Sequence, residues 1–268
     1  MRGSSAKSLT AVLSAVGGVT GVKAASALGA ELFAVTATLD REVALRRVLT
    51  DPSTETAGKQ ALVSTVFGAS LDAGTIEVLK VAVAGRWASG RDLVDGLEIA
   101  GVNAWAQSSA ASKKGEKLES ELFAASQLVH DNAELRAVVA DRTVSTEAKA
   151  TLLASIFKSK VSAPTLAVLT QAAATRGGSF EKVIDRFIRQ IADRQGEIVA
   201  VARVAYALSE AEVTRLETGL AAKYGRPVQL NLVVDPSIVG GISVSVGDEV
   251  VDATMSTRLE SARRLIAG

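Results

Sequence analysis

Apolar residues recur with a helical period through about the first 190 residues of the chain. In the segment 28–39 they lie at i, i+4, i+7 and i+11, and the segment 118–129 repeats this spacing. An α-helix places such positions on one face, so each segment predicts an amphipathic helix with one face in a core. The positions are Leu28, Leu32, Val35 and Leu39, and then Leu118, Leu122, Ala125 and Val129.

Both segments belong to an internal duplication. Residues 28–95 align without a gap with residues 118–185, 90 positions later, and 22 of the 68 aligned pairs are identical. Unrelated segments of similar composition give about 5 or 6 identities, so two copies of one unit explain the match. The identical pairs include Glu31 and Glu121, Phe33 and Phe123, Asp51 and Asp141, Lys59 and Lys149, and Arg86 and Arg176.

A change of period to two after Gly196 indicates strands. Ser209 and Glu212 form a capping-box pattern ahead of a helix that ends at Gly225. The pair Gly247-Asp248 suits a two-residue hairpin turn with glycine first. The predicted strands cover residues 198–204, 228–234 and 242–246, with a fourth after the hairpin and a last helix over about 254–266.

These patterns predict a mostly α protein: two tandem antiparallel helical bundles of about six helices each, followed by a small α+β domain. Brief connections and only four prolines favour the antiparallel arrangement. The expected domains are residues 1–95, 96–194 and 195–268.

The composition of the chain excludes several classes of partner and of catalytic site. The net charge is +1, so the overall field does not favour nucleic acid or anionic lipid. There is no cysteine, and His130 is the only histidine, which excludes disulfides, thiolate nucleophiles, the usual zinc clusters and catalysis that needs a second imidazole. His130 follows an apolar helical face and is interpreted as a surface or helix-end residue.

The N-terminus has the outline of a secretory signal, because Arg2 and Lys7 precede a weakly apolar run over 9–22. Gly17 and Gly18 interrupt that run, which favours a folded segment instead. No stretch of 18 strongly apolar residues without a charge is found, so no membrane span is expected.

The segment 234–252, with sequence VDPSIVGGISVSVGDEVVD, followed by Arg258-Leu259-Glu260, closely resembles the C-terminal signature of the ATP synthase delta (OSCP) subunit family. The resemblance covers about residues 97–268. The additional copy at 1–95 resembles the enlarged delta subunits of actinobacteria, and Ala253-Thr254 replaces the glycine-serine usual in the family. The signature residues are Asp235, Pro236, Gly240, Gly241, Gly247, Asp248, Asp252, Arg258 and Leu259.

The resemblance implies a non-catalytic stator subunit without a cofactor, present in one copy and bound at the cytoplasmic side of a bacterial plasma membrane through its complex. The helical domain would grip an N-terminal helix of the alpha subunit, and the C-terminal domain would grip the end of the b-type peripheral stalk. We expect the second bundle to make the alpha contact, so deletion of residues 1–95 should leave head binding measurable.

Several residues have both a structural and a partner-binding interpretation. A helix-end arginine stabilises the helix dipole, whereas the same side chain can contact an acidic partner. Trp105 can be a core aromatic or an interface anchor. The candidate partner contacts are Arg176, Arg258, Arg263, Arg264 and Trp105.

Two other classes of function stay open at this point. A regulatory module that binds a small molecule predicts a concave polar pocket in the C-terminal domain. An enzyme that uses Asp235, Asp248 and Asp252 predicts raised carboxyl pKa values in a cleft. Gly240-Gly241 could cradle a phosphate, but it lacks the strand, loop and helix setting, which favours a tight entry to a strand.

Overall fold

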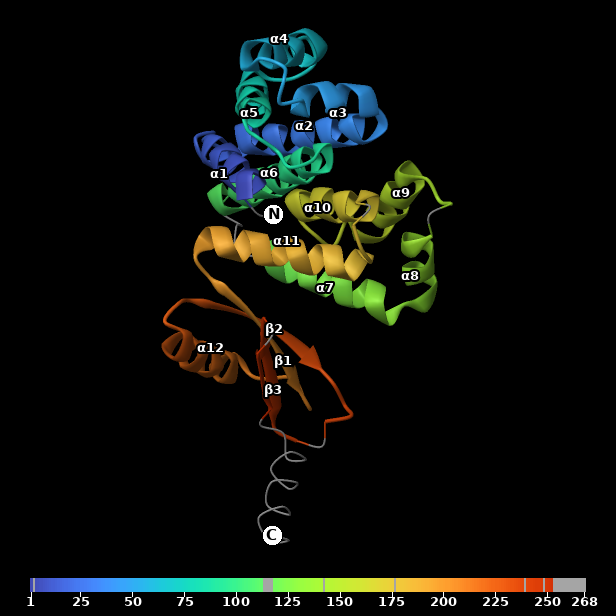
Figure 1. Cartoon of the computed structure of the whole chain (residues 1–268). Helices are drawn as coiled ribbons and strands as arrows, with labels where there is room; N and C mark the ends of the chain where they lie inside the picture. Colours follow the sequence, from blue (N-terminus) through green and yellow to red (C-terminus); the bar gives the residue numbers. More distant parts are fainter. Residues whose placement is uncertain are drawn as a thin grey trace, which may run out of the picture. The chain divides into compact units, whose positions relative to one another are not determined.

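The computed structural model describes residues 1, 3–112, 118–141, 143–175, 177–238, 240–247 and 249–252. Within these ranges the chain forms twelve α-helices and four β-strands, and the strands are confined to the C-terminal part (Figure 1). The predicted class, mostly α with a small α+β domain, is confirmed.

The duplication is visible in the helix boundaries. Shifting α3, α4 and α5 by 90 residues reproduces both ends of α8, α9 and α10. The first copy contains α1 (Gly3–Gly17), α2 (Val22–Arg41), α3 (Val43–Thr50), α4 (Thr56–Phe67), α5 (Ala73–Ala84) and α6 (Gly90–Ala111). The second contains α7 (Leu118–Asp131), α8 (Ala133–Ala140), α9 (Thr146–Phe157), α10 (Ala163–Ala174) and α11 (Phe180–Gln195).

Helix α6 serves both copies. It packs on α1, α2, α3 and α5 of the first copy and also on α10 of the second. A shift of 90 residues places α1 on 93–107, inside α6, so α6 takes in the second copy the place that α1 takes in the first. The boundary expected near residue 95 therefore lies inside one continuous helix.

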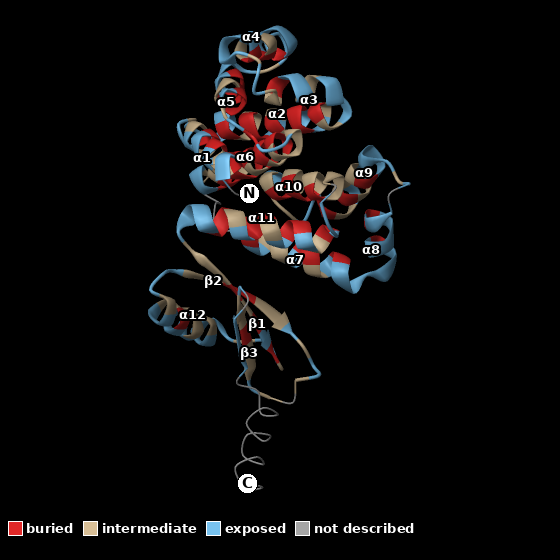
Figure 2. Ribbon diagram, viewed as in Figure 1, coloured by how far each residue is buried: buried red, intermediate tan, exposed pale blue. Residues whose placement is uncertain are grey.

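Two compact units make up the chain, residues 1–187 and residues 188–268. The division into domains 1–95, 96–194 and 195–268 stays a prediction. All eight apolar positions predicted to face a core in 28–39 and 118–129 are buried, at most 3% exposed. Figure 2 shows buried positions along the inward faces of the helices and solvent-exposed ones on their outer faces.

Close approach of α2 and α6 depends on two glycines. A Cβ atom at Gly29 would lie 2.7 Å from Cδ1 of Trp105, and one at Gly101 would lie 2.5 Å from Cε1 of Phe33. Real Cβ contacts are longer, so each aromatic ring sits where only glycine leaves room. Each of the two helices thus contributes one aromatic ring and one glycine to the contact between them.

The C-terminal unit is a four-stranded sheet with one helix on it. The strand order is β2-β1-β3-β4, with β1 parallel to β2 and the other pairs antiparallel. The elements are β1 (Ile198–Val204), α12 (Glu210–Tyr224), β2 (Val228–Val234), β3 (Ile242–Val246) and β4 (Glu249–Asp252). This order confirms the prediction up to β4, and the last predicted helix, 254–266, lies outside the described residues.

Local signals in this unit are also confirmed. Ser209 and Glu212 form the capping box of α12, and the helix ends at Gly225 in a left-handed conformation. The predicted apolar stripe of α12 packs on the sheet with the buried residues Ala200, Ala202, Leu220, Leu230 and Val244.

Among the described helices, α2 is long and apolar enough to cross a membrane. The core helix of a soluble protein passes the same test. Because α2 buries Leu28, Leu32, Val35 and Leu39 in the core of the helical unit, we treat it as a core helix.

Candidate functional site

The signature segment connects β2 to β3 past the end of β1. Asp235 follows β2, and its backbone N–H donates a hydrogen bond of 2.8 Å to the carbonyl of Val204 at the end of β1. Its carboxylate accepts from the backbone N–H (2.9 Å) and the hydroxyl (2.6 Å) of Ser237. These hydrogen bonds lower the pKa of Asp235 below its ordinary value and form an Asx turn around Pro236. Asp235 therefore organises the backbone of the loop.

The signature glycines lie at chain reversals. Gly241, after Gly240, has a φ of +86° directly ahead of β3, and Gly247 has a φ of +58° between β3 and β4. Val246 pairs with Glu249, as expected for a two-residue hairpin turn. The tight-entry interpretation of Gly240-Gly241 agrees with this geometry, because the pair opens a strand and not a helix.

Exposed polar contacts fix β4 to the end of α12. Lys223 Nζ lies 2.7 Å from one oxygen of Glu249, and the hydroxyl of Tyr224 donates to the other oxygen at 2.9 Å. The lysine contact is the main reason that the pKa of Glu249 is lowered. No sequence pattern indicates this cluster, because Glu249 lies 25 or 26 residues beyond Tyr224 and Lys223.

Six of the singled-out residues lie outside the described parts of the chain, so their interpretation stays a prediction: Arg176, Asp248, Arg258, Leu259, Arg263 and Arg264. Asp252 ends β4. Trp105 lies on α6 against Gly29, and its buried indole N–H has no hydrogen-bond partner among the described residues. Trp105 is half-buried, and both its core and its partner-contact interpretations stay predictions.

A shallow groove runs between α9 and α10 on the second copy. Its volume is about 460 Å³, and small or apolar side chains line it. On α9 these residues are spaced i, i+1 and i+4, and on α10 they are spaced i, i+3, i+4 and i+7. Such spacing forms a continuous strip along each helix. The lining residues are Ala150, Thr151, Ala154, Ala163, Leu166, Ala167 and Thr170.

The equivalent surface of the first copy carries larger polar side chains at three of the seven positions. Ala150, Ala167 and Thr170 correspond there to Gln60, Glu77 and Lys80. Lys80 Nζ lies 2.8 Å from Glu77 Oε1, and the amide of Gln60 donates to the carbonyl of Lys80 at 3.3 Å. The duplicated unit therefore presents a groove of small side chains in its second copy and hydrogen-bonded charges in its first.

Glu98 forms a buried polar cluster where α6 meets α10 and α11. The amide of Gln171 (2.8 Å) and the hydroxyl of Thr175 (2.5 Å) donate to one oxygen, and Arg186 lies 3.3 Å from the other. Burial raises the pKa of Glu98, and the hydrogen bonds from Thr175 and Gln171 oppose that rise. Sequence reasoning missed this cluster, since its partners lie 73 to 88 residues away.

The described residues contain no group of three or more histidine, cysteine or acidic side chains that could hold a metal ion. Of the three acids named for an enzyme, Asp235 has a lowered pKa, the opposite of the raised value that this alternative predicts. His130 is exposed in the last turn of α7, as predicted.

Comparison with known proteins gives a consistent result. The family model described as "ATP synthase delta (OSCP) subunit" matches residues 99–266. The chain is similar to three proteins named "ATP synthase subunit delta". It is 42% identical to that of Nocardioides sp., over 100% of this chain and 98% of the relative. It is 38% identical to that of Thermobifida fusca, over 100% of both, and 40% identical to that of Streptomyces coelicolor, over 100% and 98%.

The additional copy falls outside the family model but inside these relatives, since their alignments span the whole chain. In the cryo-EM structure of the Toxoplasma gondii mitochondrial ATP synthase hexamer, one chain aligns with 61% of this chain and 96% of its own length. The TM-score is 0.33 and the identity 17%, and a likeness this weak supports no conclusion.

Proposed function

The chain belongs to the ATP synthase delta (OSCP) subunit family, in the enlarged actinobacterial form, and on that premise we propose that it is a non-catalytic stator subunit. In this role it links the N-terminal helices of the alpha subunits in the catalytic head to the C-terminal end of the b-type stalk and resists rotor torque. One copy acts per complex, at the cytoplasmic side of the plasma membrane.

The groove between α9 and α10 is the observation that supports a contact with the catalytic head. A partner helix laid into a groove anchors apolar side chains at i, i+3, i+4 and i+7, and small residues let its backbone approach closely. Ala154, Ala163 and Ala167 supply such a surface on the second copy. The first copy carries an ion pair at the equivalent place, which favours the second copy as the alpha-binding bundle.

We assign the stalk contact to the C-terminal unit. Helix α12 has a shallow apolar depression of about 340 Å³ lined by Leu216, Gly219 and Leu220 together with Glu212 and Arg215. Apolar side chains with charged neighbours resemble the centre and rim of a protein interface. The basic helix expected over 254–266 would add attraction for an acidic stalk end.

A matched pair of charge substitutions tests the head contact. Ala154→Glu places a carboxylate in the groove. Ser64→Glu introduces the same residue at the equivalent position of the first copy. Burying an unpaired charge in an interface costs more than about 1.4 kcal/mol, so Ala154→Glu should weaken head binding at least about tenfold. Ser64→Glu should leave binding within about twofold.

Calorimetric titration of purified catalytic head into each folded variant provides the readout. Equal affinities of both variants would show that the groove is not part of the interface. A loss of affinity confined to Ser64→Glu would show that the first copy makes the contact.

A further inference from the structure

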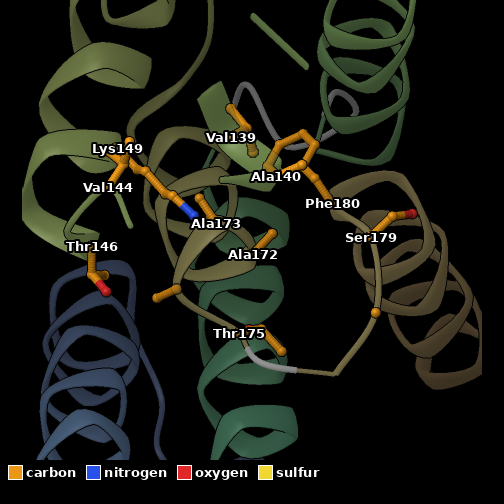
Figure 3. A pocket seen from close by; sticks show the side chains of 12 residues that line it. Val139, Ala140, Val144, Thr146, Lys149, Ala172, Ala173, Thr175, Ser179 and Phe180 are labelled. Atoms are coloured by element: carbon orange, nitrogen blue, oxygen red, sulfur yellow. The ribbon is translucent and has the colours of Figure 1, made fainter. Parts of the chain in front are cut away.

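The second copy contains a cavity of about 590 Å³ at the corner where the end of α8, the start of α9, the end of α10 and the loop into α11 meet (Figure 3). In the first copy, Trp87 stands at this corner in place of Gly177, and its indole N–H donates at 2.8 Å to the carbonyl of Ala82. Lys149 lines the cavity, but Lys59, its equivalent in the first copy, is just as buried. The buried lysine is therefore a packing feature of the repeated unit and not a sign of a ligand.

The depression on α12 opens on the side of the helix that faces β4. Lys223 and Tyr224, at the end of α12, both bind Glu249, the first residue of β4. Residues three or four apart lie on the same side of a helix, so Gly219 and Leu216 follow Lys223 along this side. Both residues line the depression. The depression therefore lies next to the half of the sheet that β3 and β4 form.

The sheet continues the apolar surface of this depression. Val251 on β4 is the cross-strand partner of Val244 on β3, and Val244 is buried in the core that α12 covers. Paired residues of antiparallel strands point to the same side of a sheet, so Val251 lies on the side that carries α12. Helix α12 packs on β2, at the other edge of the sheet, and Val251 remains 39% exposed. An apolar strip thus runs from the flank of α12 to β4.

Gly219 leaves room for a closely packed neighbour beside this strip. A glycine inside a helix is destabilising relative to alanine, and it is favoured where another part of the chain approaches closely. Gly29 in α2 and Gly101 in α6 have that role, because aromatic rings fill the space beside them. A Cβ atom at Gly219 would meet no described atom within 4 Å. The described residues therefore leave the space beside Gly219 empty.

The C-terminal segment, residues 253–268, begins at one end of this strip. Because β4 is antiparallel to β3 and β3 is antiparallel to β1, β4 has the same direction as β1, which leads into α12 through a short loop. Glu249 meets the end of α12, so Asp252 lies toward its start. The helix predicted over 254–266 would be about 20 Å long, close to the length of about 22 Å for α12. The C-terminal segment is therefore long enough to follow α12 along its length.

The sequence of this segment supplies an apolar face and a complementary charge. Its apolar residues recur at i, i+4, i+7, i+10 and i+11, which a helix places on one side. Arg258 borders this side near the start of the segment, and Glu212 forms the rim of the depression near the start of α12. Opposite charges at the same end favour a parallel arrangement of the two helices. The apolar residues are Met255, Leu259, Ala262, Leu265 and Ile266.

We propose that residues 254–266 form a helix that packs in the depression of its own chain, parallel to α12 and over Val251. Ala262 then lies beside Gly219, where two small residues let the helix backbones approach closely. The segment removes the apolar strip from water and completes the core of the C-terminal unit.

This arrangement adds a step to the stalk contact and rests in that respect on the proposed function. The stalk end and the C-terminal segment use the same depression, so the stalk end displaces the segment when it binds. Displacement frees Arg258, Arg263 and Arg264 to pair with acidic residues of the stalk.

Engineered disulfides test the packing, and the chain contains no cysteine that could interfere. Gly219→Cys with Ala262→Cys should form an intramolecular disulfide under mild oxidation of the full chain, because a disulfide needs Cα atoms within about 7 Å of each other. Gly219→Cys with Glu260→Cys is the control, since Glu260 lies on the opposite side of the predicted helix. The control pair should react at least about tenfold more slowly, as measured by mass spectrometry under denaturing conditions.

Hydrogen exchange gives a second measurement, on the unmodified chain. The amides of 254–266 should be protected in the free chain, because a helix this short is marginal in water unless it is packed. Gly219→Leu fills the depression and should speed their exchange at least about tenfold, whereas Thr214→Leu, at an exposed position away from the depression, should not. Rapid exchange in the unmodified chain, equal rates of both disulfide pairs, or unchanged exchange in Gly219→Leu would overturn the proposal.

Purified stalk separates the packing from the displacement. Binding of the stalk to the unmodified chain should speed the exchange of residues 254–266. Unchanged exchange in the bound chain would contradict the displacement, and absence of stalk binding would contradict the proposed stalk contact. Neither result changes what the free chain shows about the packing.

Discussion

At the scale of single residues, Glu98 shows how one buried acid joins three helices. Its carboxylate is held by Gln171 and Thr175 from the end of α10 and by Arg186 from α11. Taking a carboxylate out of water is costly, and donors on both oxygens recover part of that cost. Removal of the acid would take the acceptor from the Gln171 amide, whereas the Thr175 hydroxyl keeps the Gln171 carbonyl at 2.9 Å.

The raised pKa of Glu98 makes the stability of the folded protein depend on pH. Burial raises its pKa in the folded protein above the ordinary value of 4.5. The folded state then holds the proton to higher pH than the unfolded chain does. Glu98 therefore adds its full contribution to the free energy of unfolding at a pH below 4.5, the pKa of the unfolded chain. This contribution is lost as the pH rises through the higher pKa of the folded protein.

We predict that Glu98→Gln removes this fall, since glutamine resembles the protonated acid and does not titrate. Urea unfolding, followed by circular dichroism from about pH 4.5 to about pH 8, should give a free-energy difference between wild type and variant that shifts toward the variant as pH rises. Subtraction cancels the carboxylates shared by both proteins, including Asp141 and Asp235. A difference that is constant with pH would contradict the assignment.

At the scale of elements, the close packing of α2 on α6 depends on glycine. Gly29→Ala would bring its Cβ to 2.7 Å from the ring of Trp105, so the ring or the helix must shift. Such overpacking costs about 1–3 kcal/mol. Gly58→Ala in α4 is the control, because its Cβ would meet no atom closer than 3.8 Å and should stabilise the helix by about 0.5–1 kcal/mol.

Thermal and urea unfolding of both variants measure this difference. If Gly29→Ala proved as stable as Gly58→Ala, Trp105 would be free to move, and its interpretation as an interface anchor would gain support over that of a core aromatic.

The same elements show what sequence can and cannot predict. The helical period and the duplication predicted the helices and their buried faces. The apolar positions that start at Leu28 and those that start at Leu118 have the same spacing, and both sets are buried. The role of α6 was missed, since α1 was not recognised as a counterpart of 93–107. Burial of Lys59 and Lys149 was also missed, because a charged residue in a helix is expected at the surface and only packing places its stem in the core.

At the scale of the whole molecule, the two copies have diverged on one scaffold. The first copy has Trp87 at its corner and an ion pair between Glu77 and Lys80 on its surface, whereas the second has a cavity and a groove of small side chains. Because α6 packs against helices of both copies, the first copy supports a helix that the second copy needs.

That shared helix changes how the role of the first copy can be tested. Deleting residues 1–95 cuts α6 and exposes the surface that α2 covers, so loss of head binding by such a fragment would not separate misfolding from a lost contact. Point substitutions at equivalent positions, such as Ala154 and Ser64, separate these two causes because both leave α6 intact.

The central claim is that this chain attaches to the catalytic head through the N-terminal segments of the alpha subunits. Its most direct test is calorimetric titration of the unmodified chain into purified head from the same organism, repeated with head that lacks those segments. Tight binding to intact head that is lost on truncation is the predicted result. No binding to intact head, or equal binding to both forms, would contradict the account.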